Sequence, residues 1–132
     1  MKRIVLIALV VAIGTLLGGG CKPSQQANEM VNTIGVEEFA KVIAKSENIR
    51  LIDVRTPEEF AEEHLQGAEN IDVKSPDYAR KIKGVKGKVA VYCRSGRRSL
   101  NAANQLVAQG CTVYDLRGGI IAWKEAGKPT TK

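Results

Sequence analysis

The sequence has one histidine, three cysteines and few aromatic residues, which make up 5% of its 132 positions. A structural zinc site needs four clustered Cys or His ligands, so these dispersed residues exclude a zinc tetrad, and we expect no metal and no cofactor. Nucleic-acid-binding domains combine a basic stripe with aromatic side chains, and the low aromatic content argues against that class. No internal repeat or low-complexity tract is present.

The length allows one domain with a hydrophobic core that needs no metal or disulfide to hold it. The formal charge is +6. Removing the first 20 residues takes away two of the 20 basic residues and none of the 14 acidic ones, which leaves +4. A mildly basic surface of this kind attracts small anions.

The N-terminus has the pattern of a targeting segment. Lys2 and Arg3 supply positive charge, residues 4–17 are apolar except for a glycine and a threonine, and residues 18–20 are glycines that lead to Cys21. The apolar run is short for a membrane span, which needs about 20 apolar residues. An uncleaved anchor, an ordinary secretory signal and a lipoprotein signal are the three interpretations.

We favour the third, because the segment ending at Cys21 resembles a bacterial lipoprotein signal. The resemblance implies that Cys21 is lipidated and becomes the mature N-terminus. Gly18 departs from the pattern, which has an aliphatic residue at that place. We therefore predict a signal peptide over residues 1–20 and a lipidated N-terminus and tether over 21–28. The predicted location is extracytoplasmic or periplasmic, at a membrane reached through the lipid on Cys21.

Residues 29–129 alternate between β-type and helical patterns, and residues 130–132 form a C-terminal tail. Strands separated by helices predict an α/β fold with a five-stranded, mainly parallel sheet and helices on both faces. The expected strands are 30–34, 49–54, 68–73, 88–92 and 112–116, and the expected helices begin near 36, 56, 75, 99 and 120. Thr56 followed by Pro57 is a typical helix start.

The most informative stretch is an apolar strand that ends in Cys93, followed by an arginine-rich loop and a helical segment. Strand, loop and helix N-terminus in this order form an anion-binding cup, since backbone N–H groups point inward and the helix dipole adds positive potential. These surroundings favour the thiolate form of a cysteine. We predict that Cys93 is a nucleophile that handles a small sulfur anion; the alternative is a structural cysteine at a strand end.

If Cys21 belongs to the signal, a disulfide could join only Cys93 and Cys111. Cys93 closes one predicted strand and Cys111 opens the next, so in a parallel unit they lie at opposite ends of neighbouring strands. A five-residue strand spans about 16 Å, whereas the Cα atoms of a disulfide lie within about 7 Å. We therefore expect Cys111 to be a buried small hydrophobe and Cys93 to be free.

In open parallel sheets, binding sites lie at the carboxyl ends of the strands. Cys93, Asp53 and the turn at residues 117–119 all fall on that edge of the predicted sheet.

Three separated segments carry a family resemblance. Residues 51–71, 91–99 and 114–129 resemble the N-terminal signature, the active-site loop and the C-terminal signature of single-domain rhodaneses, which are sulfurtransferases. The resemblance implies a rhodanese-like fold and a reaction in which Cys93 takes a sulfane sulfur from thiosulfate or a persulfide. The Cys93 persulfide then passes its sulfur to cyanide or a thiol acceptor.

The same resemblance suggests roles for the residues around Cys93. The predicted substrate-binding residues are those of the loop: Arg94, Ser95, Gly96, Arg97, Arg98 and Ser99. Arg98 matches a loop-closing arginine and is expected to face the cup, while a solvent-exposed charge is the alternative for Arg97. Ser99 is explained equally well as a helix N-cap. Asp53 and Arg55 are expected to brace the loop by an ion pair, and His64 to make only local hydrogen bonds.

Two other functions are considered. Phosphatases and arsenate reductases of this fold resemble the chain but carry one more residue between cysteine and arginine. Four residues separate Cys93 from Arg98, which favours sulfur over a tetrahedral oxyanion. A non-enzymatic sulfur carrier or binding module is the other alternative. The presence of Cys93 argues against a module that only binds a partner, but it does not exclude a sulfur carrier. Nothing in the sequence requires more than a monomer.

Overall fold

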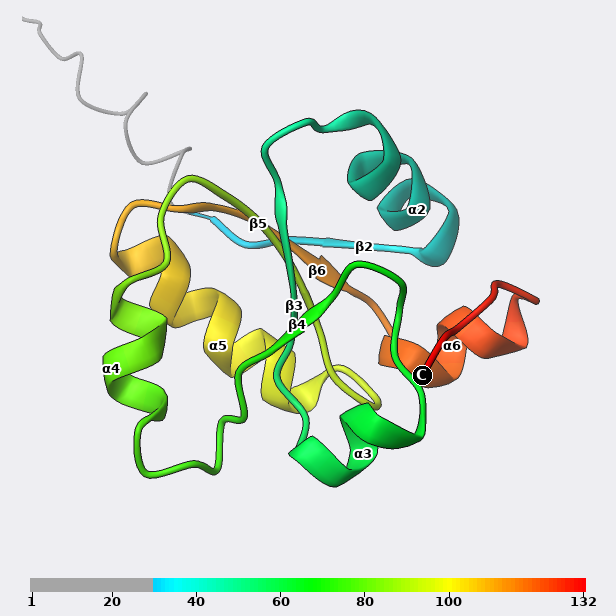
Figure 1. The fold of residues 1–132 in the computed structure, drawn as a ribbon. Coiled ribbons are helices and arrows are strands. Elements are labelled where there is room, and N and C mark those ends of the chain that lie inside the picture. Colours follow the sequence, from blue (N-terminus) through cyan, green and yellow to red (C-terminus); the bar gives the residue numbers. More distant parts are fainter. Residues whose placement is uncertain (1–29) are drawn as a thin grey trace, which may run out of the picture.

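The strand β5 lies at the centre of a five-stranded sheet in the computed structural model, which describes residues 30–132. The strand order is β2-β6-β5-β3-β4, and all four pairings are parallel (Figure 1). The strands are β2 (Asn32–Ile34), β3 (Arg50–Asp53), β4 (Glu69–Asn70), β5 (Lys88–Tyr92) and β6 (Thr112–Leu116). The predicted α/β fold with a five-stranded sheet is confirmed, and the sheet is parallel throughout.

Strand β5 shows why the sheet needs helices on both faces. Val89 and Val91 pack into one core, while Ala90 and Tyr92 pack into the other. Successive side chains of a strand point to opposite faces, so four consecutive buried residues leave no face for water. Both faces must therefore be covered.

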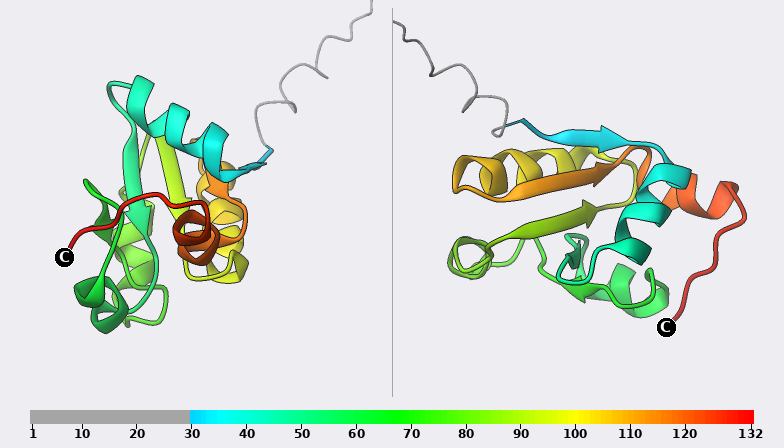
Figure 2. Two further views of the ribbon diagram at one scale, coloured as in Figure 1. Left: turned by 90° about the vertical axis from the view of Figure 1, so that its right-hand side faces the viewer. Right: turned by 90° about the horizontal axis from the view of Figure 1, so that it is seen from above.

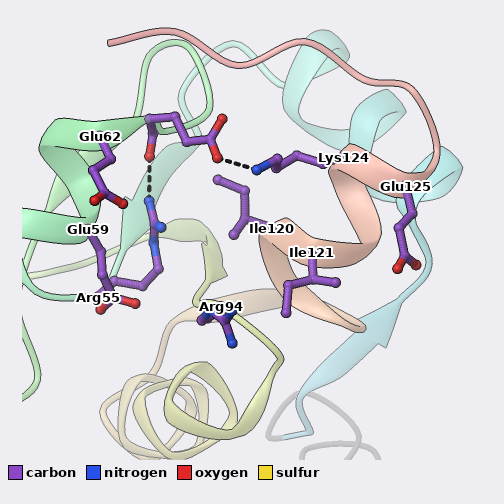
Figure 3. Close-up of a pocket in the computed structure, with 9 residues that line it drawn as sticks. Arg55, Glu59, Glu62, Arg94, Ile120, Ile121, Lys124 and Glu125 are labelled. Atoms are coloured by element: carbon purple, nitrogen blue, oxygen red, sulfur yellow. Dashed lines mark hydrogen bonds and ion pairs between the residues drawn. The ribbon is translucent and has the colours of Figure 1, made fainter.

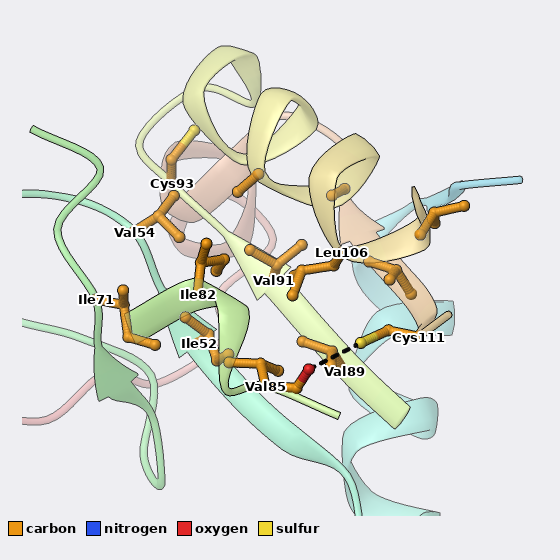
Figure 4. Close-up of a cluster of buried hydrophobic side chains, with 14 residues drawn as sticks. Ile52, Val54, Ile71, Ile82, Val85, Val89, Val91, Cys93, Leu106 and Cys111 are labelled. Atoms are coloured by element: carbon orange, nitrogen blue, oxygen red, sulfur yellow. Dashed lines mark hydrogen bonds between the residues drawn. The ribbon is translucent and has the colours of Figure 1, made fainter. Parts of the chain in front are cut away.

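Helices α4 (Tyr78–Lys83) and α5 (Arg97–Ala108) cover one face (Figure 2). Ala102, Ala103 and Leu106 of α5 pack there with Ile82 of α4 against β5 (Figure 4). Helices α2 (Val36–Lys45) and α6 (Gly119–Glu125) cover the other face. The core on that side includes Phe39 and Trp123, whose rings meet edge to face with centroids 6.3 Å apart.

Helix α3 (Pro57–Glu62) is short and buries no residue completely. It is stabilised at its start by a capping box: the Thr56 hydroxyl accepts from the Glu59 N–H at 3.2 Å, and the Glu59 carboxylate accepts from the Thr56 N–H at 3.1 Å. The predicted helix start at Thr56-Pro57 is confirmed. Helix α3 and the N-termini of α5 and α6 follow strands β3, β5 and β6, so all three gather at the carboxyl edge of the sheet.

Several predicted boundaries are wrong. Helix α4 begins at Tyr78, three residues later than expected, because residues 75–78 form a turn in which the Ser75 carbonyl accepts from the Tyr78 N–H. Strand β2 begins at Asn32, two residues later than expected.

The strand expected over residues 68–73 is only the two-residue β4, because its one neighbour β3 ends at Asp53 and the chain then turns at Asp72, whose carbonyl accepts from Ser75 N–H. Helix α5 begins at Arg97, two residues earlier than expected. Its N-cap is Gly96, so the interpretation of Ser99 as an N-cap is wrong.

Cys93 and Cys111 are both free, as predicted, and Cys111 is buried, as predicted. Cys93 is buried as well. They lie toward opposite ends of the core between β5 and α5 (Figure 4). Cys111 is 2% exposed, and its thiol lies 3.4 Å from the Val85 carbonyl oxygen. Burial raises the pKa of the Cys111 thiol, which fits its expected role as a small core residue.

The last residues of the chain are held against the turn after α3. Thr131 and His64 exchange two backbone hydrogen bonds of 2.8 Å, and the Thr130 hydroxyl donates to the Glu63 carboxylate at 2.9 Å. The predicted signal peptide (1–20) and lipidated tether (21–28) lie outside the described residues. Among residues 30–132, none of the helices combines the length and apolar character that a bilayer crossing demands.

Candidate active site

Cys93 directly follows β5, at the carboxyl edge of the sheet. The residue is 1% exposed, and its Sγ accepts a hydrogen bond from the backbone N–H of Gly96 at 3.0 Å. This contact closes a tight turn over the sulfur. A hydrogen bond from a backbone amide stabilises a sulfur that carries negative charge.

The loop after Cys93 offers further amide groups. Arg97, Arg98 and Ser99 form the first turn of α5, where N–H groups have no partner within the helix. Among residues 30–132, none of these three amides, nor those of Arg94 and Ser95, donates to a backbone carbonyl. Unpaired amides at a helix N-terminus form a site for an anion.

Gly96 makes the turn possible. Its φ of 114° lies in the left-handed region, which is strained for any residue with a side chain. The chain can therefore reverse within three residues of Cys93 and direct the Gly96 N–H back at the sulfur.

The N-terminus of α6 supports the loop from the other side. Ile120 N–H donates to the Cys93 carbonyl at 2.9 Å, and Ile121 N–H donates to the Arg94 carbonyl at 3.2 Å. A side chain on Gly119 would place its Cβ 2.3 Å from the Arg94 carbonyl oxygen. This glycine is required because the two backbones touch, and the contact holds the first part of the loop in place.

Arg98 pairs with Glu59 of α3. Its two terminal nitrogens donate to the two carboxylate oxygens at 2.9 and 3.1 Å. The hydrogen bond from Arg98 is the main reason that the pKa of Glu59 falls from 4.5 to about 2. The pKa of Arg98 is raised, chiefly by its hydrogen bond to Glu59 and against the opposing effect of burial, with a smaller contribution from the neighbouring Cys93. The guanidinium thus fixes α3 to α5 and adds positive potential near the sulfur.

Asp53 and Arg55 form a second pair at the end of β3. Arg55 Nη2 donates to Asp53 Oδ2 at 2.7 Å and to the Glu63 carbonyl at 2.7 Å. Both side chains are almost fully buried, and the guanidinium lies 5.8 Å from the centre of the Tyr92 ring. The pair ties β3 to the end of α3 and to the last residue of β5, which precedes Cys93.

Ser99 faces the interior. Its hydroxyl donates to the Asp115 carboxylate at 2.6 Å, and Thr33 donates to the other oxygen at 3.2 Å. Burial raises the pKa of Asp115, against the opposing effect of these two hydrogen bonds. The Ser99 side chain therefore anchors the first turn of α5 to β6 and β2, and what Ser99 offers to the cup is its backbone N–H.

A cleft of about 350 Å³ lies beside the loop, between α3 and α6 (Figure 3). Arg94 lines the cleft, and Ile120 and Ile121 form its apolar wall. Lys124 pairs with the Glu63 carboxylate across it. Arg94, which is exposed, lines the cleft together with two other cations, Arg55 and Lys124, and with four glutamates: Glu59, Glu62, Glu63 and Glu125.

Comparison with known proteins agrees with this geometry. Residues 35–126 match the profile of the rhodanese-like domain. The chain belongs to the rhodanese-like domain family. It is 38% identical over 101 residues to a "Sulfurtransferase" of Allochromatium vinosum, an alignment that covers 76% of this chain and 94% of that one. It is 38% identical over 94 residues to "Thiosulfate sulfurtransferase 16, chloroplastic" of Arabidopsis thaliana, covering 61% and 78%.

Solved structures show the same fold. A rhodanese-related protein from Thermoplasma volcanium superposes with a TM-score of 0.63 and 28% identity, covering 76% of this chain and 97% of that one. The rhodanese-like fold expected from the three sequence segments is therefore confirmed, and relatives of this family include sulfurtransferases.

The structure places the predicted site residues in three groups. The Gly96 N–H donates to the sulfur, while the side chains of Arg94, Ser95 and Arg97 are exposed. Arg98 is directed to Glu59, and Ser99 is directed to Asp115. His64 stacks on Phe60 with ring centroids 3.7 Å apart, and its Nδ1 lies 2.8 Å from the Phe60 carbonyl oxygen.

Sequence reasoning missed Glu59, Asp115 and the amides of α6 as parts of the rhodanese-like site. Glu59 has a clear local signal as the third residue of a capping box, but that signal does not reveal its pairing with Arg98, 39 residues away. Asp115 is an acid in an otherwise buried strand, a pattern that predicts a buried hydrogen-bond partner. Among residues 30–132, no cluster of three or more His, Cys, Asp or Glu side chains is suited to hold a metal ion.

Proposed function

We propose that this rhodanese-like protein is a sulfurtransferase that carries a sulfane sulfur as a persulfide on Cys93. The observation that supports this most directly is the loop around Sγ: one amide donates to it, and five more loop amides make no hydrogen bond to a backbone carbonyl of residues 30–132. Such a cup stabilises a negative charge one atom beyond the cysteine sulfur, which is where a persulfide carries it.

The first half-reaction uses thiosulfate or a persulfide as the donor. The Cys93 thiolate attacks the outer sulfur, the new S–S bond forms, and the bond between that sulfur and the leaving group breaks. The leaving group departs with the electron pair, as sulfite from thiosulfate or as a thiolate from a persulfide. In the second half-reaction, cyanide or a thiolate attacks the terminal sulfur, giving thiocyanate or a new persulfide and restoring the Cys93 thiolate.

The low solvent exposure of Cys93 limits which sulfur donors can reach its Sγ. With 1% of the residue accessible, only a narrow terminal group reaches Sγ. The outer sulfur of thiosulfate or of a persulfide is a single terminal atom, which meets this requirement. The backbone N–H groups of residues 94–99 then hold the transferred sulfur, and no general base is needed once the thiolate is present.

The loop arginines have different roles in this proposal. Arg94 and Arg97 are exposed and attract an anionic donor to the mouth of the cup, as long-range electrostatic steering does. Arg98 is held by Glu59 and supplies fixed positive charge close to the sulfur. Asp53 and Arg55 keep the end of β3 in place beneath the loop.

Intact-mass analysis after incubation with thiosulfate tests the function. We expect the protein to gain the mass of one sulfur atom, to lose it on addition of cyanide, and to gain nothing as the Cys93→Ser variant. Cys111→Ser is the matched control, because Cys111 is equally buried but lies away from the cup. Its adduct should equal that of the parent protein. Hydrolysis of an aryl phosphate without any sulfur adduct would instead favour a phosphatase.

We also propose that the protein is exported and acts as a monomer anchored to a membrane through a lipid on Cys21. Support comes from the sequence: a positive start, an apolar run and a cysteine after small residues. Mass spectrometry of the N-terminal peptide from the native host should show diacylglycerol on Cys21. A mature chain that begins at another residue contradicts the lipid anchor and leaves the proposed sulfur transfer unaffected.

A further inference from the structure

The edge of the sheet opposite Cys93 carries a group of lysines, which we call the basic edge: Lys45, Lys83, Lys86 and Lys88. Lys83 ends α4, Lys86 lies in the turn that follows, and Lys88 is the first residue of β5. Lys45 ends α2, and four residues separate it from β3. All strands are parallel, so their first residues share one edge, while Cys93 and its loop occupy the other (Figure 2).

The charges of the basic edge are not neutralised. Seven ion pairs are formed among residues 30–132, and none of them involves these four lysines, all of which are exposed. By contrast, Arg80 and Lys81 on the same helix α4 both pair with Asp77. Glu69, the first residue of β4, is paired with Arg50 and does not neutralise these lysines.

The described chain begins at this same edge. Met30 lies two residues before β2 and is 67% exposed. Strand β2 pairs with Tyr114–Leu116, the second part of β6, so in this parallel register Met30 lies toward the level of Thr112, the first residue of β6. The Thr112 N–H donates to the Gly87 carbonyl in the turn before β5. Met30 therefore lies toward the same edge of the sheet as Lys86 and Lys88, across β6 from the start of β5.

The length of chain between Cys21 and Met30 limits the distance between the basic edge and a lipid anchor on Cys21. Eight residues, 22–29, separate Cys21 from Met30. Fully extended, they span at most about 28 Å. A tether this short raises the effective concentration of a bilayer surface at the basic edge, so that weak electrostatic contacts become sufficient.

We infer that the basic edge contacts the anionic headgroups of a lipid bilayer and turns Cys93 away from the membrane. Clustered lysines next to an anchor are attracted to anionic lipids over about one Debye length, near 10 Å. The four lysines lie on the side from which the chain approaches its anchor, and the reactive loop lies on the far side. This inference rests on the anchored location proposed above and does not depend on sulfur transfer.

The experiment uses the full chain reconstituted by its own N-terminal segment into neutral phosphatidylcholine vesicles or vesicles with added phosphatidylglycerol. A water-soluble amine-acylating reagent reports lysine access by mass spectrometry. At low salt, labelling of Lys83, Lys86 and Lys88 should slow about tenfold in the anionic vesicles and recover at high salt. Lys74 and Lys132, which are exposed and form no ion pair in the described chain, serve as internal controls and should not change. Equal labelling of the two groups in both vesicles contradicts the inference.

A second measurement does not require the anchor. All five strands and both cores lie within residues 32–123, so residues 30–132 contain a complete domain. This domain should sediment with anionic vesicles at low salt, and the Lys83→Gln/Lys86→Gln/Lys88→Gln variant should bind about tenfold more weakly. The matched variant Lys74→Gln/Lys128→Gln/Lys132→Gln, which removes the same number of charges away from the basic edge, should bind like the parent. Equal loss in both variants would show a general charge effect and overturn the inference. Persulfide formation should be the same in all three proteins.

Discussion

Two arginine–carboxylate pairs flank the Cys93 loop, and they differ in burial. The side chains of Asp53 and Arg55 are 0% and 5% exposed, whereas those of Glu59 and Arg98 are 27% and 24% exposed. The first pair joins residues two positions apart, and the second joins α3 to α5 across 39 positions. One pair is part of the interior, and the other is a bridge at the rim of the site.

The difference in burial separates stability from function. A buried pair is costly to break, because the remaining partner keeps its charge without water or a counter-ion. A half-exposed pair contributes little to stability, since water screens it, but it can still orient a charged group toward a substrate. We therefore expect Asp53–Arg55 to determine whether the domain folds and Glu59–Arg98 to determine how well the loop works.

The largest effect should follow from Asp53→Ala. Arg55 then remains buried with an unpaired charge, and we expect the free energy of unfolding to fall by about 3–5 kcal/mol, measured by urea denaturation. The double variant Asp53→Leu/Arg55→Met removes both charges and should regain most of this loss. If the double variant is as unstable as the single one, the pair has a role other than charge compensation.

Arg98→Gln should affect activity more than folding. Removing this half-exposed cation should cost about 1 kcal/mol of stability or less, while the rate of persulfide formation should drop about tenfold, because fixed positive charge near Cys93 is lost. Arg98→Lys keeps the charge but cannot bind Glu59 through two nitrogens, and should give an intermediate rate. Arg80→Gln, on the exposed side of α4, is the control and should leave the rate unchanged. A normal rate in Arg98→Gln would assign Arg98 a purely structural role.

The pH dependence of the free energy of unfolding should reveal the contribution of the Glu59–Arg98 pair. The pKa of Glu59 is lowered from 4.5 to about 2 in the folded protein. A lowered pKa means that the carboxylate stabilises the fold at pH values above 4.5, and that this contribution is lost progressively as the pH falls toward 2. After allowance for solvent screening, it amounts to no more than about 1 kcal/mol.

Comparison with Glu59→Gln isolates this contribution. The variant should be less stable than the parent at neutral pH, and the two unfolding curves should converge as the pH approaches 2. A constant difference over this range would mean that the ionisation of Glu59 does not contribute.

The smallest effect should come from the exposed pair between Arg50 and Glu69, at the edge far from Cys93. Its side chains are 40% and 44% exposed. Glu69→Gln should change the free energy of unfolding by about 0.5 kcal/mol or less and leave persulfide formation unaltered. A larger loss of stability would show that exposure is a poor guide to the strength of ion pairs in this domain.

Local signals predicted the elements well where the determining contacts are close in sequence. Thr56 and Pro57 mark the start of α3 because a helix cap depends on residues within one turn. The near-continuous apolar run over residues 88–92 is typical of a buried parallel strand, since such a strand has no polar face. The start of α5 was misplaced because the cap is a glycine with positive φ, which no side-chain signal marks.

The sequence alone determined the alternation of strands and helices, the position of Cys93 at a strand end and its distance from Cys111. Each of these follows from periodicity and chain geometry over short distances. Only the tertiary structure decided that Arg98 binds Glu59, that Ser99 is turned to Asp115, and that α6 supports the loop through the amides of Ile120 and Ile121. These contacts join separate elements, and their partners are selected by the packing of the whole sheet rather than by the residues next to them.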